Sequence, residues 1–226
     1  LEKVEILGFV DNESSLNWIK EAGGKVVNLL CKGSENHVRH QLRKTPEEHI
    51  NGIKQVLRNA KEKDIKVNLY LEDWSNGMRN SKDYVYQFID SLKDENVERF
   101  MLPDTLGILN PDEVYEYLKD IRERYPGIHF DFHAHNDYDL GAGNIFAAAK
   151  AGSNGLHATV NGLGERAGNV TLSSMIGIIH DQITKTETNV NESKLHLVST
   201  LVETFSGIRI PANKPIVGGN VFTQTS

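Results

Sequence analysis

The chain has 226 residues, 38% of them hydrophobic and 25% charged, a composition typical of a globular protein with one core or two small ones. Its formal net charge of −6 and isoelectric point of about 5.9 argue against nucleic acid or an anionic membrane as the main partner. No run of 18 apolar residues predicts a membrane span, and the single cysteine, Cys31, excludes an internal disulfide and fits a reducing cytoplasm.

Short apolar or alternating runs recur along the chain, and a helical pattern follows each. They are KVEILGF (3–9), KVVNLLC (25–31), KVNLYLE (66–72), ERFMLPD (98–104), IHFDFHA (128–134) and GLHATVN (155–161). Such strand–helix units predict a parallel α/β fold, either an open doubly wound sheet or a (β/α)8 TIM barrel. The first run opens the chain with neither an initiator Met nor a signal peptide, so we expect a barrel whose first two units are missing.

Three helices are predicted from their spacing and end signals. One has helical spacing from Glu48 and ends near Lys63, and a second takes Asn110 as N-cap and Pro111 as its first residue. The third, over 191–207, closes with Gly207. It places Leu195, Val198, Leu201, Val202 and Phe205 on one face. We expect 1–207 to form the partial barrel and the Pro-, Gly- and Asn-rich stretch 208–226 to begin a linker.

Functional side chains of parallel α/β folds gather at the carboxyl ends of the strands. In this chain those ends carry Leu7, Phe9, Leu30, Tyr70, Glu72, Asp73, Asp104, Thr105, His133, His135 and the loop NGLGERAGN (161–169).

His133 and His135 stand two residues apart at a strand end, so both side chains are predicted to leave the same face. Two imidazoles placed in this way can bind one cation, or they can be a hydrogen-bonded polar pair. Other polar residues at neighbouring strand ends, Glu72, Thr105 and Asn169, favour the metal-binding interpretation.

The loop 161–169 is glycine-rich, but its G-x-G-x-x-x-G spacing is one residue longer than the dinucleotide-binding fingerprint. Its glycines permit close approach to a ligand. Asn169 offers an amide oxygen to a cation, and it also precedes a helical run that it could cap.

Several other residues can be interpreted in two ways. Glu72 is a general base or a salt-bridge partner, and Asp104-Thr105 positions a substrate carboxylate or forms a turn. We expect His157 to be a hydrogen-bonded core residue, Cys31 to be inert packing and Trp74 to pack beneath a loop. The remaining histidines, His37, His40, His49, His129, His180 and His196, are predicted at the surface or on helices.

Four segments together resemble one enzyme family: FHAHNDYDLGAGN, NGLGERAGN, LPDTLG and FSGIRIPANKPIVGGNVFTQTS. They are similar to the 2-isopropylmalate, homocitrate and citramalate synthases, which belong to the metal-dependent TIM-barrel lyases and Claisen-condensing enzymes. The resemblance runs from Leu1 to Ser226. It implies the third to eighth strands of a (β/α)8 barrel, cut at both ends, without the R-D-G motif that supplies a metal-binding Asp.

The resemblance also implies roles for single residues. His133, His135 and Asn169 would be metal ligands, Thr105 would bind the substrate carboxylate, and Glu72 would hold or deprotonate a reacting group. Leu7, Leu30 and Tyr70 would line a small apolar pocket for the methyl group of pyruvate. Phe9 and Asn136 would lie on the acetyl-CoA side.

The implied reaction is the condensation of acetyl-CoA with a 2-oxo acid, with a divalent metal (Zn, Mn, Co or Mg) as cofactor. EILGF, NLLCKGS and LYLEDWSNG resemble (R)-citramalate synthase most, which favours pyruvate. The alternatives are 2-isopropylmalate synthase, a related TIM-barrel lyase, or an inactive fragment or binding scaffold. We expect a cytoplasmic protein that is a homodimer at full length, and we expect this chain alone to be inactive.

Overall fold

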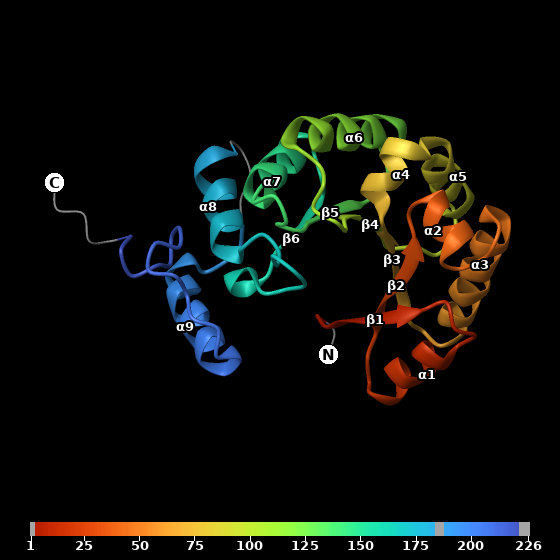
Figure 1. The fold of residues 1–226 in the computed structure, drawn as a ribbon. Helices are drawn as coiled ribbons and strands as arrows, with labels where there is room; N and C mark the ends of the chain where they lie inside the picture. Colours follow the sequence, from red (N-terminus) through yellow and green to blue (C-terminus); the bar gives the residue numbers. More distant parts are fainter. Residues whose placement is uncertain (1–2, 184–187, 222–226) are drawn as a thin grey trace. The chain divides into compact units, whose positions relative to one another are not determined.

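The computed structural model describes residues 3–183 and 188–221, in which strands alternate with helices (Figure 1). The strands are β1 (Glu5–Phe9), β2 (Val26–Lys32), β3 (Lys66–Glu72), β4 (Arg99–Asp104), β5 (Phe130–Ala134) and β6 (Gly155–His157). The α-helices are α1 (Ser14–Glu21), α2 (Glu35–His40), α3 (Pro46–Glu62), α4 (Trp74–Asn80), α5 (Lys82–Leu92), α6 (Pro111–Arg124), α7 (Gly141–Lys150), α8 (Leu172–Gln182) and α9 (Leu195–Ser206). Two short 3-10 helices are η1 (Val160–Gly162) and η2 (Glu192–Lys194).

The predicted alternation of strands and helices is confirmed, with one correction at the last strand. We predicted this strand over 155–161, but β6 ends at His157. Asn161 takes a left-handed backbone with φ of 61°, inside η1, and this conformation cannot continue a strand. Residues 222–226 of the predicted linker, and the first two residues of the predicted domain, lie outside the described residues.

The chain forms two compact units. The first comprises Leu1–Leu106 with Asp120–His133, and the second comprises Gly107–Lys119 with Ala134–Ser226.

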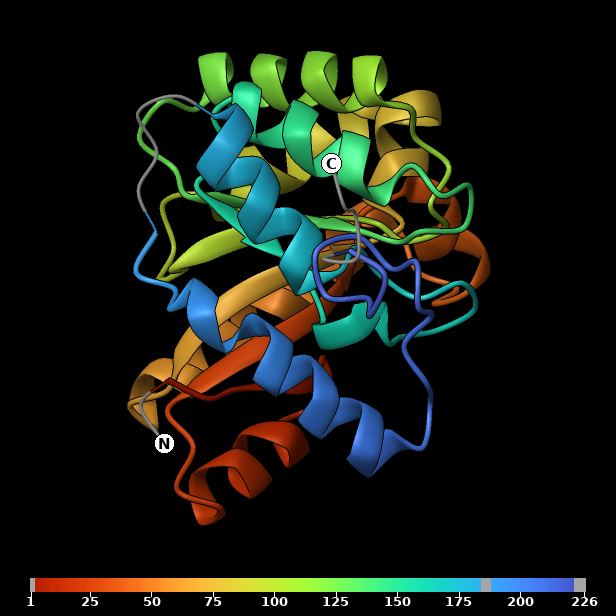
Figure 2. The ribbon, with the colours of Figure 1, turned by 90° about the vertical axis from the view of Figure 1, so that its left-hand side faces the viewer.

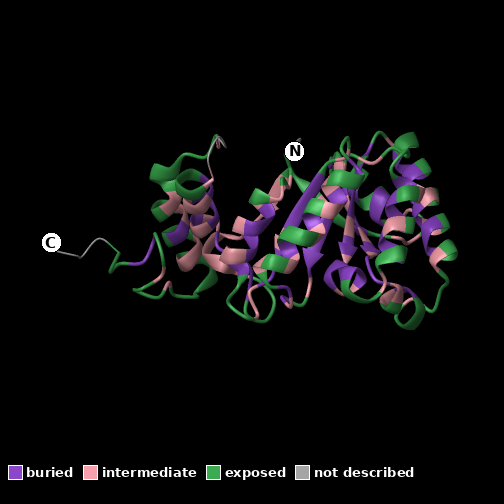
Figure 3. Ribbon diagram, turned by 90° about the horizontal axis from the view of Figure 1, so that it is seen from above, coloured by how far each residue is buried: buried purple, intermediate pink, exposed green. Residues whose placement is uncertain are grey.

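In the first unit, strands β1 to β4 pair in parallel and in chain order. Helices α1, α3 and α5 lie along one face of these strands (Figure 1), and most of the strand residues are buried (Figure 3). In β2, Val27, Leu29 and Cys31 point into this core and are fully buried, while the residues between them face the other side. Burial also raises the pKa of the Cys31 thiol far above its usual range, as expected for an inert packing residue.

Local sequence explains where the long helices begin. The hydroxyl of Thr45 accepts a hydrogen bond from Glu48 N (3.2 Å), and the Glu48 carboxylate accepts one from Thr45 N (2.7 Å), which satisfies both donors at the start of α3. Asn110 and Glu113 make the same reciprocal pair ahead of α6, with 3.0 Å from Glu113 N to Asn110 Oδ1. The predicted N-cap of this helix is therefore confirmed.

In the second unit, helices α7 and α8 pack side by side (Figure 2). Helix α9 ends at Gly207, whose φ of 70° confirms the predicted cap. Its predicted apolar face stays open to solvent in part, since Leu201 is 46% and Phe205 84% exposed. No helix in the described ranges is both long enough and apolar enough to cross a membrane.

His49 lies on a helix, as predicted, but on the buried face of α3, and only 2% of it is exposed. Its Nε2 accepts a hydrogen bond from Lys32 N (3.0 Å), which requires that nitrogen to be unprotonated. Burial, together with the ammonium groups of Lys44 and Lys32, lowers the pKa of His49 to about 4.

The unfolding free energy should therefore fall as the pH drops from 6.5 towards 4, because the unfolded chain takes up this proton first. A pKa shift from 6.5 to about 4 corresponds to a loss of about 3 kcal/mol over that window. Denaturant unfolding across this pH window would measure the loss in the parent and in His49→Gln. Glutamine keeps a hydrogen-bond acceptor but does not titrate. The control is His180→Gln, whose side chain is 65% exposed. Equal pH slopes in the parent and His49→Gln would contradict the assignment.

Candidate functional site

At the carboxyl ends of β1 to β3, one row of side chains crosses the sheet. The register pairs Phe9 with Leu30 and Leu30 with Tyr70, so these three lie side by side on the face opposite the buried helices. Leu7 pairs with Asn28, one row nearer the amino ends. The sequence grouped Leu7 with Leu30 and Tyr70, whereas the register makes Phe9 the direct neighbour of Leu30. Leu7 and Phe9 are 54% and 49% exposed.

This row continues to His133 of β5. The rings of Tyr70 and His133 meet edge to face, with 6.0 Å between their centroids. His133 is partly buried.

Glu72 forms an ion pair with Lys32, the residue opposite it in the register of β2 and β3. The side chains are 24% and 14% exposed, so both charges are partly withdrawn from water. The structure therefore shows the salt-bridge reading of Glu72. Lys32 was not among the predicted site residues. The signal for it was its position two residues after Leu30, on the same face of the strand.

A second group of polar side chains gathers around Asp73, directly after β3. The Asp73 carboxylate accepts hydrogen bonds from the Ser34 hydroxyl (2.6 Å) and the Asn76 amide (2.8 Å), and His37 Nε2 lies 3.4 Å from it. The Asp73 backbone N–H donates to the Thr105 hydroxyl (2.8 Å). We call these residues, Ser34, His37, Asp73, Asn76 and Thr105, the Asp73 cluster.

The Asp73 cluster orients the Thr105 side chain. The Thr105 hydroxyl oxygen accepts from Asp73 N, and this bond fixes the direction of the hydroxyl group. Asp73 is 1% exposed and has a left-handed φ of 67°. A buried carboxylate in a strained conformation is a common mark of a functional site. Sequence reasoning listed Asp73 at a strand end but gave it no role.

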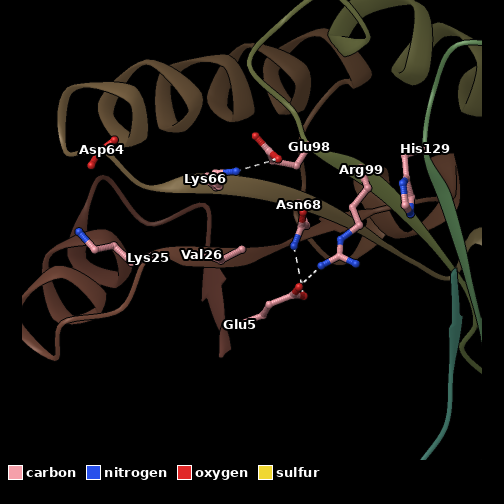
Figure 4. A pocket seen from close by; sticks show the side chains of 9 residues that line it. All are labelled: Glu5, Lys25, Val26, Asp64, Lys66, Asn68, Glu98, Arg99 and His129. Carbon is pink, nitrogen blue, oxygen red and sulfur yellow. Dashed lines mark hydrogen bonds and ion pairs between the residues drawn. The ribbon is translucent and has the colours of Figure 1, made fainter. Parts of the chain in front are cut away.

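A polar cavity of about 590 Å³ lies at the opposite, amino ends of the first strands (Figure 4). Two of its bases face acids: Lys66 lies 3.3 Å from Glu98, and Arg99 pairs with Glu5 and with Asp131. Paired charges at this end of a parallel sheet serve stability rather than chemistry.

In the second unit, His135 and Asn169 are opposite each other in an isolated antiparallel bridge. They are 8% and 7% exposed. The Asn169 amide nitrogen donates to Leu163 O (3.3 Å), and its Oδ1 is buried with no hydrogen-bond partner among the described residues. The residue that caps α8 is Thr171, whose hydroxyl accepts from Ser174 N (3.3 Å), so the cap reading of Asn169 is wrong.

A bidentate ion pair made by Arg166 fixes the glycine-rich loop to the segment after β5. Arg166 donates from Nε and Nη2 to the two carboxylate oxygens of Asp137, at 2.8 and 2.9 Å. The guanidinium lowers the pKa of Asp137 below its usual range. Asn136 N also donates to Gly168 O (3.0 Å). Together these contacts hold Asn169 beside His135.

Asn136, predicted on the acetyl-CoA side, uses its side chain locally. Its Oδ1 accepts from Gly141 N (3.0 Å) at the start of α7, and its Nδ2 donates to Asp139 (2.9 Å). Its role towards acetyl-CoA stays a prediction.

The residues predicted as metal ligands can be tested against the donor atoms they offer. No group of three His, Cys, Asp or Glu side chains suited to a metal occurs in the parts of the chain that the structure describes. Among the residues predicted as ligands, Asn169 offers an amide oxygen. That oxygen is buried and has its lone pairs available, and together with imidazole nitrogens it suits Zn²⁺, Mn²⁺, Co²⁺ or Mg²⁺.

Gly168 allows the glycine-rich loop to close on itself. Its φ is 81°, and a Cβ at this position would overlap the carbonyl oxygen of Gly162. We expect Gly168→Ala to lower the unfolding free energy by about 2 kcal/mol or more, since left-handed strain alone costs about 1 kcal/mol. Gly207→Ala is the matched control, because Gly207 also has a left-handed φ, of 70°, but open space around it. Comparing the denaturant unfolding of the two variants separates the cost of left-handed backbone strain from the cost of steric overlap with Gly162. Equal losses of unfolding free energy in the two variants would contradict the close approach of Gly168 to the carbonyl oxygen of Gly162.

Residues 8–202 match the HMGL-like family. A candidate (R)-citramalate synthase of Methanopyrus kandleri is 33% identical over 207 residues, which are 91% of this chain and 40% of that protein. A candidate 2-isopropylmalate synthase of Ignicoccus hospitalis is 33% identical over 215 residues, 95% of this chain and 53% of that protein. A homocitrate synthase of Sulfolobus acidocaldarius is 35% identical over 193 residues, 84% of this chain and 40% of that protein. The chain thus spans about half or less of the length of these relatives.

Among solved structures, the HMG-CoA lyase of Bacillus subtilis superposes with a TM-score of 0.79 at 22% identity. The match covers 92% of this chain and 72% of that one. At this identity the likeness shows the fold alone, and it confirms the predicted TIM-barrel class.

Proposed function

The chain belongs to the HMGL-like family, and on that premise we propose that it serves a metal-dependent, Claisen-type condensation of acetyl-CoA with a 2-oxo acid. The relatives named as synthases of citramalate, 2-isopropylmalate and homocitrate support this reaction class. The observation that carries the proposal is the buried Oδ1 of Asn169, which has no hydrogen-bond partner among the described residues and lies on the residue opposite His135.

We propose His133, His135 and Asn169 as the metal ligands. When bound, a divalent cation would supply Lewis acidity to the keto group of the 2-oxo acid. The chain's own residues would bind and orient the substrate. Thr105, whose oxygen already accepts from Asp73 N, would donate its proton to the substrate carboxylate.

Glu72 would hold or accept a proton near the reacting carbon. Its ion pair with Lys32 fixes the direction of the carboxylate, and a positioned carboxylate is what proton abstraction needs. Release of free CoA by hydrolysis of the product thioester would make the reaction irreversible.

We propose pyruvate as the 2-oxo acid, giving (R)-citramalate. The support is the row of Leu30 and Tyr70, apolar and aromatic side chains that lie side by side at the strand ends, with the Tyr70 ring edge to face with the His133 ring. Phe9, the neighbour of Leu30, adds bulk to the same row. The alternative is 2-oxoisovalerate, the substrate of a 2-isopropylmalate synthase, which the Ignicoccus relative favours equally by identity.

The test follows free CoA with a thiol reagent, using the protein as its gene encodes it. It supplies acetyl-CoA, a divalent metal and either pyruvate or 2-oxoisovalerate. We expect release that prefers pyruvate and stops in EDTA. The preference should be at least about 10-fold, because a single methylene in an apolar pocket is worth about 10- to 200-fold and 2-oxoisovalerate carries two more carbons than pyruvate. A preference for 2-oxoisovalerate would establish the alternative, and no release with either would refute the condensation.

A further inference from the structure

A polar pocket of about 390 Å³ lies within the second unit, and of its lining residues only Asn136 and Asn169 have a predicted functional role above. Its walls come from the segment after β5, the start of α8 and a turn at 211–215. The lining residues include Asn136, Asn169, Thr171, Ser174, Asn213 and Lys214.

The turn that carries Lys214 is fixed by backbone bonds and by packing. Lys214 N donates to Pro211 O (2.9 Å), and Gly218 N donates to Lys214 O (2.9 Å). Ile216 packs on α8 at Gly177, where a Cβ would come within 2.6 Å of its Cδ1. Val217 is 3% exposed. This part of the stretch that we predicted as a linker is therefore docked on the second unit.

Lys214 brings an unneutralised positive charge to the pocket. Its side chain is partly buried, and no ion pair to it occurs among the described residues. Its Nζ lies 4.0 Å from the place where a Cβ of Gly162 would be, so the ammonium reaches the glycine-rich loop.

Of the two acids near this pocket, Asp137 and Asp139, only Asp137 is paired with a base among the described residues. Asp137 is taken by the two nitrogens of Arg166. Asp139, which lines the pocket, accepts from the Asn136 amide (2.9 Å). The cavity at the amino ends of the first unit is the contrast, because there Lys66 faces Glu98 and Arg99 faces Glu5. A partly buried ammonium without a counter-ion is costly to the folded chain and attracts an anion.

We propose that this pocket binds an anionic oxygen group of a substrate through Lys214, with the hydroxyl of Ser174 and the amide of Asn213 as neutral donors. The inference rests on the proposed function, which supplies two sources of such a group: a phosphate of coenzyme A and the carboxylate of the 2-oxo acid. The buried Oδ1 of Asn169 in the same wall is a second mark of a binding site. A volume of about 390 Å³ accepts one such group with its neighbouring atoms.

The test measures affinity by titration calorimetry at low salt, on the protein as its gene encodes it. The probes are CoA, pantetheine, which lacks the phosphates, and pyruvate. Lys214→Met removes the charge and keeps the length of the side chain. Lys194→Met, an exposed lysine of the same unit, is the control. We expect Lys214→Met to weaken one anionic probe about 10-fold or more, the effect of losing one hydrogen bond to a charged group.

A loss for CoA with pantetheine unchanged would assign the pocket to a phosphate, and a loss for pyruvate alone would assign it to the carboxylate. Unchanged affinity for both CoA and pyruvate, or equal losses in Lys194→Met, would overturn the proposal. Lys214→Arg keeps the charge and should retain the affinity, which covers the case in which Lys214→Met does not fold. Binding that depends on Lys214, without any CoA release, would refute the proposed function but support the proposal that the pocket binds an anionic group.

Discussion

His135→Ala is expected to lower the affinity of the protein for a divalent cation by at least about 100-fold. Loss of a residue that only supports a metal ligand already costs about 10- to 100-fold, so loss of a ligand should cost at least as much. The expectation rests on the place of His135, 8% exposed and opposite the unpartnered Oδ1 of Asn169. Titration of the metal-free protein with Co²⁺ would measure it, since the visible absorption of Co²⁺ reports nitrogen ligands directly.

Two further variants make this experiment specific. Asn169→Ala should weaken Co²⁺ binding as well, because it removes the amide oxygen and leaves the imidazole in place. His180→Ala is the control, since that histidine lies on α8 of the same unit with 65% of its side chain exposed. Equal affinity in His135→Ala and the parent would remove His135 from the set of ligands, and an equal loss in His180→Ala would point to adventitious surface binding.

Asp73→Ala is expected to lower the unfolding free energy by roughly 3–5 kcal/mol, the range for breaking a buried charged pair or network. The carboxylate is 1% exposed and accepts from Ser34 and Asn76, and these donors would lose their partner inside the protein. Alanine also tolerates the φ of 67° less well than aspartate does. Urea unfolding of the first unit, followed by the fluorescence of the buried Trp74, would measure the loss.

Asp73→Asn separates the charge from the shape of the side chain. It keeps one acceptor and the tolerance of a left-handed backbone, so we expect a smaller loss than for alanine. Asp94→Ala is a suitable control, because Asp94 is an exposed acid outside the helices and strands of the same unit. A loss of less than 1 kcal/mol in Asp73→Ala would show that the Asp73 cluster does not stabilise the strand ends.

Much of the fold followed from local patterns. Alternation in KVVNLLC and KVNLYLE predicted β2 and β3, because every second side chain of a strand faces one core. Asn110 with Pro111, and Gly207, predicted helix ends because capping depends on residues within one turn. The strand predicted over 155–161 was too long, because apolar content does not reveal the left-handed turn at Asn161.

The candidate site was predictable in part for the same reason. Strand ends are visible in the sequence, so Glu72, Thr105, His133, His135 and Asn169 could be collected before their partners were known. Their partners could not. Lys32 lies opposite Glu72 only through the register of two strands forty positions apart. Asp73 reaches Ser34 and Thr105 only where three strand ends meet.

The sequence by itself determined the order of strands and helices, the family resemblance and the residues that carry chemistry, because these depend on side chains that are neighbours along the chain. Only the tertiary structure decided which of those residues touch. It placed Phe9 beside Leu30, gave the cap of α8 to Thr171, joined Arg166 to Asp137 and brought Lys214 to the glycine-rich loop. The physical reason is that register, loop closure and burial are set by the packing of distant segments, and no local pattern encodes them.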